Sequence, residues 1–295
     1  MKKILFISLF FVSSSSVFSQ GWIWNDEIQS KYEELEVLST DTRAILPSSS
    51  SLENFAPKLP DGQDFYWSQD GTGKCVAYAL AYARTLIYNR NKRTNDLKNT
   101  FSPGFIYWTA KAEGADCFDG LDPVISCNVL LNYGAAKLID VEYPNYYPFE
   151  DKRICYSYPP NWRDDFEKAG KYKLETVKQL RNVREIKNAV SQGIPCLYGI
   201  YTVNSFDNVY GKNLWQPNTG ESPRDSEAIH ALVVIAYDDS KYGGSFLIQN
   251  SWGKEWGNHG RIWIKYDDFM EYNVAVFGLQ KRYERWNSPR LTEDD

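Results

Sequence analysis

A glycine-rich loop that runs directly into an alanine-rich apolar segment is the feature that most restricts how this chain can fold. Residues 69–74, Gln-Asp-Gly-Thr-Gly-Lys, contain two glycines and predict a turn or loop. From Cys75 to Arg90, apolar residues recur at helical spacing, and four alanines favour a helix and allow close approach of other elements. The pattern predicts a helix with one apolar face, and this helix begins at a cysteine.

Cys75 would lie at the positive end of that helix and next to Lys74, where a thiolate is stabilised. This position suits a nucleophile, provided that a base lies elsewhere in the fold. It suits a small apolar residue at a buried helix start equally well, because unpaired cysteines are usually core residues. The position alone leaves both interpretations open.

Residues 1–19 have the features of a secretory signal peptide. A charged start precedes an apolar run that is too short to span a bilayer, and small residues, Val17 and Ser19, precede the expected cleavage point. No later stretch is apolar enough to cross a membrane. We therefore expect a secreted or periplasmic protein, without membrane insertion, in a compartment that permits disulfides.

Composition excludes several classes of partner. The 295 residues carry a net charge of −5 and no basic run, so neither nucleic acid nor an anionic membrane surface is expected to bind. Only two histidines are present, His230 and His259, and any histidine-dependent chemistry must use one of them. His259 lies in a Gly-Asn-His-Gly turn and is expected at the surface. No Cys/His pair has ligand spacing, so no metal site is expected, and no cofactor.

The five cysteines are an odd number, so at least one thiol is free or paired between chains. Cys117 and Cys155 flank a long polar stretch and are the best disulfide candidates. Cys196 lies in an apolar run that predicts a buried strand, so it is interpreted as a packing residue. Cys127 lies in a helical pattern, and its role stays open.

Helical patterns precede strand patterns along the chain, which predicts an α+β protein with two lobes. Helices are predicted over 75–90, 101–108, 123–133 and 183–192, and strands over 195–201, 231–237, 245–249, 261–266 and 274–280. Residues 20–60 form an N-terminal arm, either an inhibitory pro-segment or a plain extension on the surface, with 48–51 as linker. The main domain is expected over 61–285, followed by a polar tail, 286–295.

Two further positions complete a possible catalytic set. His230 begins a strand pattern, and Asn250 follows another, within Asn-Ser-Trp-Gly. An asparagine can accept the ring N–H of a histidine and so fix its tautomer, and an aromatic beside it, Trp252, can exclude water. Cysteine, histidine and asparagine then serve as nucleophile, base and orienting group.

Four blocks in this order resemble the papain-like cysteine peptidases. They are the Cys75-Val-Ala-Tyr-Ala start, Phe-Ser-Pro-Gly-Phe-Ile-Tyr from residue 101, His-Ala-Leu-Val-Val-Ile-Ala-Tyr from His230, and Asn-Ser-Trp-Gly-Lys-Glu-Trp-Gly from Asn250. Gln69 also stands at the spacing of the oxyanion-hole glutamine of that family. The similarity extends over about residues 60–280.

The resemblance implies a helical lobe, an antiparallel β-barrel-like lobe and an active site in the cleft between them. It also implies a role for each matching residue, with no cofactor and a polypeptide as substrate. Cys75 would be the nucleophile, His230 the acid/base and Asn250 its orienting group, while Gln69 would stabilise the oxyanion. Trp252 would shield the Asn–His contact, Gly120 would bind the substrate main chain, and Cys155 would pair with Cys117.

Some positions depart from the family pattern. Thr72 replaces a half-cystine, Val76 an aromatic residue and Lys74 a serine, and Ile229 stands where an acidic residue often precedes the histidine. The leading expectation is a monomeric cysteine peptidase. The alternatives are a binding protein of the same fold without turnover, and an acyl transferase that uses the same residues.

Overall fold

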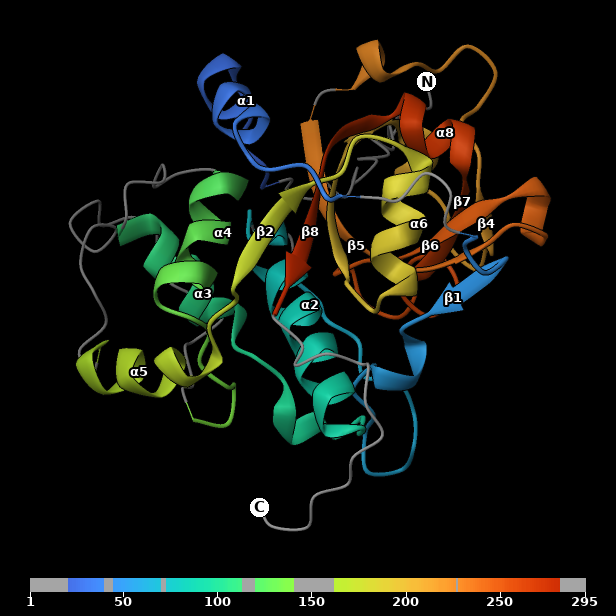
Figure 1. Cartoon of the computed structure of the whole chain (residues 1–295). Helices are drawn as coiled ribbons and strands as arrows, with labels where there is room; N and C mark the ends of the chain where they lie inside the picture. Colours follow the sequence, from blue (N-terminus) through green and yellow to red (C-terminus); the bar gives the residue numbers. More distant parts are fainter. Residues whose placement is uncertain are drawn as a thin grey trace, which may run out of the picture.

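The computed structural model describes residues 21–39, 45–69, 73–112, 120–140, 162–226 and 228–281. The predicted signal peptide and C-terminal tail lie outside these ranges, as do Cys117 and Cys155. Helices α2 to α5 lie on one side of the molecule, and the strands form a sheet beside them (Figure 1). The α-helices are α1 (Asp26–Glu33), α2 (Cys75–Lys92), α3 (Pro103–Ala112), α4 (Pro123–Asn132), α5 (Trp162–Ala169), α6 (Val183–Ser191), α7 (Asn204–Asp207) and α8 (Tyr266–Glu271).

In the part of the chain that the structure describes, the sheet has eight strands in the order β2-β8-β3-β5-β6-β7-β4, with β1 paired to β5. These are β1 (Ser49–Ser51), β2 (Thr176–Gln179), β3 (Cys196–Thr202), β4 (Leu214–Trp215), β5 (Ala228–Asp238), β6 (Ser245–Gln249), β7 (Arg261–Lys265) and β8 (Asn273–Gln280). Among these strands only β4 and β7 pair in parallel. The α+β prediction is confirmed, and each strand predicted from the sequence is present within a few residues.

Helix α2 is the centre of the molecule. Every residue from Cys75 to Ile87 is buried, so the prediction of one apolar face is wrong for this helix. The reason is that α2 lies between β5 on one side and α3 and α4 on the other. Its alanines leave room for these neighbours, because a larger side chain would hold the backbones apart.

Strand β5 contributes to both hydrophobic cores, because alternate side chains of a strand point to opposite faces. Ala231, Val233 and Ile235 join the core around α2, whereas Leu232 and Val234 join the core enclosed by the sheet, α6 and α8. His230 lies at the start of this strand, where its neighbours are fixed on both faces. The two cores correspond to the two predicted lobes.

The N-terminal arm is paired with the sheet. Residues 48–51, expected as linker, include strand β1, which pairs with the end of β5 through Ser49 and Asp238. The linker prediction is therefore wrong, because main-chain pairing orders a serine run that has no apolar pattern. Within the described ranges, no helix is both long and apolar enough to cross a bilayer.

Helix α5 lies inside the polar stretch 151–173, for which no helix was predicted. Phe166 packs against Phe105 of α3 and Tyr133, with ring centroids 5.4 and 5.0 Å apart. Most other side chains of α5 are polar, so its sequence shows no broad apolar stripe.

Candidate active site

Cys75 is the first residue of α2, and its side chain is fully buried. The backbone N–H of Gly21 donates a hydrogen bond to its sulfur over 3.2 Å. Burial raises the pKa of the Cys75 thiol to about 11, although the N–H groups of Ala231 and Gly21 favour the thiolate. Ala231 directly follows His230, so the cysteine at the helix start lies at the beginning of β5.

His230 is fully buried, and its Nε2 lies 2.7 Å from Oδ1 of Asn250. The other ring nitrogen, Nδ1, is buried and has no hydrogen-bond partner among the described residues. Burial lowers the pKa of the His230 imidazole to about 4, against the hydrogen bond to Asn250, which favours the charged ring. In this arrangement the thiol and the imidazole are both neutral at neutral pH.

Asn250 follows the last residue of β6 and is held at both its main chain and its side chain. Its N–H donates to the carbonyl of Gly260 over 2.9 Å, and its Oδ1 also accepts from the N–H of Ser251 over 2.7 Å. Trp252 stacks on the imidazole of His230, with ring centroids 4.3 Å apart and planes at 28°. The indole therefore covers the histidine beside its bond to Asn250.

Gln69 is buried beside the same segment. Its N–H donates to the carbonyl of Ser251 over 2.9 Å, and the Ser251 hydroxyl donates to its Oε1 over 2.7 Å. Ser68 pairs with Trp252, and the Gly253 N–H donates to the carbonyl of Trp67. This two-stranded contact fixes the Gln69 amide relative to Asn250.

Residues 21–23, from the N-terminal arm, contact Cys75 and pair with the segment at Gly120 and Leu121. The N–H of Leu121 donates to the carbonyl of Gly21 over 2.8 Å, and the N–H of Ile23 donates to the carbonyl of Leu121 over 3.0 Å. Gly120 has a φ of +78°, and a Cβ there would lie 2.4 Å from the Gly21 carbonyl. The main chain beside Gly120 and Leu121 is thus occupied by the chain's own arm.

Trp22 anchors this segment. Its side chain is buried and lies against the Cα of Gly199 in β3, where an added Cβ would come within 2.8 Å of the indole ring. The rings of Phe277 and Trp24 lie 5.9 and 6.0 Å from it. Trp22 follows the residue that contacts Cys75, so its fixed side chain holds that residue in place.

The sequence-predicted residues thus meet where α2, the start of β5 and the segment after β6 come together. Gly21 and Trp22 were not predicted, because nothing in a short Gly-Trp segment indicates which part of the fold it contacts. Cys127 and Cys196 are buried and unpaired in the described part of the chain, in agreement with the packing role predicted for Cys196. His259 is exposed in its turn, as expected. No group of three or more His, Cys, Asp or Glu residues in the described ranges could hold a metal ion.

Two known proteins are similar to this chain over most of its length. An uncharacterized peptidase C1-like protein of Acanthamoeba polyphaga mimivirus is 22% identical over 270 residues, 84% of this chain and 83% of its own. Cathepsin K of Gallus gallus is 25% identical over 240 residues, covering 77% of this chain and 67% of its own.

Solved structures share the fold. Xylellain, a cysteine protease from Xylella fastidiosa, superposes with a TM-score of 0.71 at 20% identity, over 90% of this chain and 97% of its own. Digestive procathepsin L 3 of Tenebrio molitor superposes with a TM-score of 0.64 at 15% identity, over 90% of this chain and 76% of its own. The papain-like two-lobe fold is therefore confirmed.

The sequence model of the papain family cysteine proteases matches residues 116–278. This range includes Gly120, His230, Asn250 and Trp252, and it begins after Gln69 and Cys75. The match covers more than half of the chain, so the protein belongs to the papain family of cysteine proteases, and it is a cysteine peptidase that acts on polypeptides.

Proposed function

We propose that Cys75, His230, Asn250 and Gln69 carry out the peptidase reaction in the roles predicted from the sequence. The observation that supports this most strongly is the His230–Asn250 hydrogen bond under Trp252, with the Cys75 sulfur beside the next residue of β5. Asn250 accepts from Nε2, so Nδ1 is the ring atom that is left to exchange a proton with the thiol.

The reaction then follows from these positions. His230 takes the thiol proton, and the thiolate attacks the substrate carbonyl carbon. The Gln69 amide and the Cys75 N–H donate to the oxyanion. His230 next protonates the leaving amine, which breaks the peptide bond and leaves an acyl group on sulfur. Water, deprotonated by His230, attacks the acyl carbon, releases the acid and restores the thiol.

Cys75→Ala tests this assignment. We expect peptide hydrolysis and labelling by a thiol-directed epoxide both to be lost, whereas Cys127→Ala, which removes another buried thiol, should keep both. Hydrolysis by purified Cys75→Ala protein would overturn the assignment. Mass analysis of products formed with an added amine distinguishes transfer to water from transfer to that amine.

We also infer that the N-terminal arm keeps the enzyme latent after export. Cleavage after Ser19 would leave Gly21 as the second residue, and the Gly21 N–H contacts the Cys75 sulfur. Trp22 anchors this segment in the core, and the Cys75 side chain is fully buried beneath it, so water does not reach the sulfur. Mass measurement of the exported chain tests the cleavage point, and light scattering tests the expectation of a monomer.

Trp22→Ala tests latency separately from catalysis. It removes the anchoring indole, so we expect faster epoxide labelling of Cys75 and an earlier onset of hydrolysis than in the parent chain. Gln29→Ala, an exposed change on α1, serves as the matched control. Equal labelling rates in the parent and Trp22→Ala chains would overturn latency and leave the roles of Cys75 and His230 untouched.

A further inference from the structure

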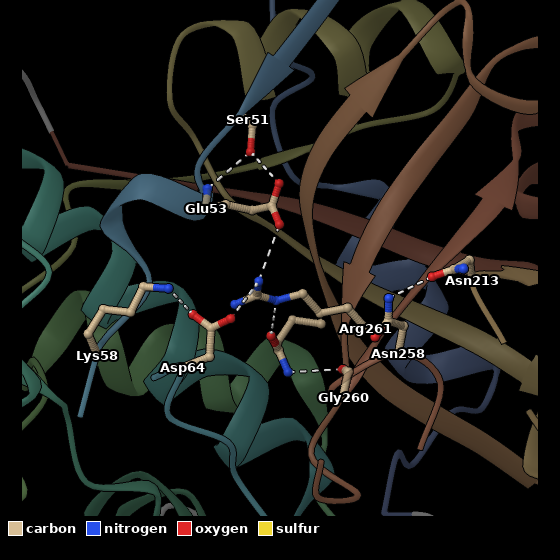
Figure 2. Close-up of polar contacts among 9 residues, drawn as sticks. Ser51, Glu53, Lys58, Asp64, Asn213, Asn258, Gly260 and Arg261 are labelled. Atoms are coloured by element: carbon tan, nitrogen blue, oxygen red, sulfur yellow. Dashed lines mark hydrogen bonds and ion pairs between the residues drawn. The ribbon is translucent and has the colours of Figure 1, made fainter. Parts of the chain in front are cut away.

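Arg261, the first residue of β7, is the centre of a polar cluster that includes Glu53 and Asp64 (Figure 2). Its side chain is 12% exposed. Its Nη1 lies 3.2 Å from Oε1 of Glu53 and 3.4 Å from Oδ2 of Asp64, and its Nε donates to Oε1 of Gln249 over 2.8 Å. One guanidinium therefore contacts three acceptors from three separate segments.

Gln249 links Arg261 to the loop that begins at Asn250. It is the last residue of β6 and is 3% exposed. Its Nε2 donates to the carbonyl of Asn250 over 2.9 Å and to the carbonyl of Gly260 over 3.0 Å. Because Arg261 occupies the amide oxygen, the NH₂ group must face the two carbonyls at the ends of the loop.

Gly260 makes this closure possible. Its φ is +72°, and a Cβ there would lie 3.1 Å from the Gln249 amide nitrogen. The Gly260 carbonyl accepts from both Gln249 and Asn250, so the loop from 250 to 260 is closed at its base. Within that closed loop, Asn250 presents Oδ1 to His230.

The two acidic partners of Arg261, Glu53 and Asp64, belong to segments outside the sheet that carries Asn250. Asp64 lies five residues before Gln69 and also binds Lys58, and residues 67–69 pair with residues 251–253. Glu53 belongs to the arm, just after β1. Burial opposes the charge on Arg261, but Tyr82, Asp64 and Glu53 together raise the pKa of the guanidinium, so it remains a cation.

We propose that Arg261, acting through Gln249, is a positioning residue that fixes Asn250 and thereby the His230 ring for the peptidase reaction. The proposal rests on the roles assigned to Cys75, His230 and Asn250 above. A lysine cannot substitute fully, because one ammonium cannot reproduce the planar fork that serves Gln249 and the two carboxylates together. Without Arg261 we expect the His230 ring to be misplaced, which affects turnover rather than substrate binding.

The test compares Arg261→Met, Arg261→Lys and Gln249→Leu in the full chain. Epoxide titration measures the concentration of enzyme whose Cys75 is reactive, and kcat is calculated from that concentration. We expect kcat to fall about tenfold or more in Arg261→Met, with KM within about twofold, because small displacements of a catalytic group are costly. The bell-shaped pH profile of kcat/KM should also narrow on both sides. Loss of a well-placed Asn250 acceptor destabilises the imidazolium, so the thiolate–imidazolium pair exists over a smaller pH range.

Further comparisons separate positioning from folding stability. Lys58→Met removes a cation from the same cluster without touching Gln249, so it should lower thermal stability but leave kcat and the pH profile unchanged. Arg261→Lys should recover thermal stability more than kcat. The Arg261→Met/Gln249→Leu double variant should be no slower than the worse single variant.

An unchanged pH profile in Arg261→Met, with kcat equal to that of Lys58→Met, would overturn the positioning role. Additive losses in the double variant would overturn it as well. Activity in Cys75→Ala would instead overturn the proposed function. The two failures are therefore distinguishable.

Discussion

At the scale of single residues, the candidate nucleophile and base are held in their uncharged forms. Burial raises the pKa of Cys75 and lowers that of His230, and the N–H of Gly21 supplies one of the contacts that water would otherwise make. A cysteine reacts as its thiolate, so the covered site should be unreactive for an electrostatic reason as well as a steric one.

The pH dependence of Cys75 alkylation tests this explanation. In the intact chain, with a thiol pKa of about 11, the iodoacetamide rate should rise steadily with pH and show no plateau near neutrality. In Trp22→Ala, where water can reach the pair, a thiolate–imidazolium plateau should appear at about pH 5–8. A neutral plateau in the intact chain would contradict the neutral pair.

At the scale of secondary-structure elements, α2 is limited by the space around it. The helix carries Cys75 at its start and is enclosed by β5, α3 and α4, so its alanines set how closely these elements approach. A larger side chain would have to push a strand or a helix aside, because protein interiors are close-packed.

Ala81→Leu tests this packing. Ala81 is fully buried in α2, so the added atoms should destabilise the protein by about 1–3 kcal/mol. Asn91→Leu, at an exposed position near the end of the same helix, should stay within about 0.5 kcal/mol of the parent. Urea unfolding measures the free energy of unfolding of both variants. Equal values would contradict close packing around α2.

At the scale of the whole molecule, Arg261 joins the sheet to segments of the arm and of the helical side. Asp64 is its partner from the segment that leads to Gln69. Burial opposes ionisation of Asp64, but Lys58 and Arg261 outweigh it and lower the pKa of the carboxyl group. A lowered folded-state pKa adds stability above the unfolded value of about 4, and this is lost as pH falls through the folded value.

Asp64→Asn should therefore lower the free energy of unfolding by about 1–3 kcal/mol at neutral pH. The difference from the parent should shrink as the pH is lowered below about 4, where the native carboxylate also becomes protonated. Asp61→Asn, at an exposed position three residues earlier, is the control and should show little effect. A pH-independent difference would show that Asp64 acts through packing rather than charge.

Much of the fold could be predicted because its signals are local. Alternating or continuous apolar runs predicted β3, β5, β6, β7 and β8. The Ser-Pro pair at the start of α3 is also a local signal, and Ser102 accepts from the Phe105 N–H over 3.2 Å. Strand β1 and helix α5 could not be predicted. A serine run pairs with β5 through its main chain, and a mostly polar helix packs its Phe166 ring against Phe105 without a broad apolar stripe in its sequence.

The sequence by itself determined the helix that begins at Cys75, the strand that carries His230 and the Asn-Ser-Trp-Gly segment, because spacing and residue type are properties of the chain. Only the tertiary structure decided that Gly21 contacts the nucleophile and that Arg261 binds Gln249, which closes the loop after Asn250. These contacts join residues 54 and 208 positions apart, such as Gly21 to Cys75 and Glu53 to Arg261. No local sequence pattern predicts these contacts, because they depend on how several elements pack against one another in the folded protein.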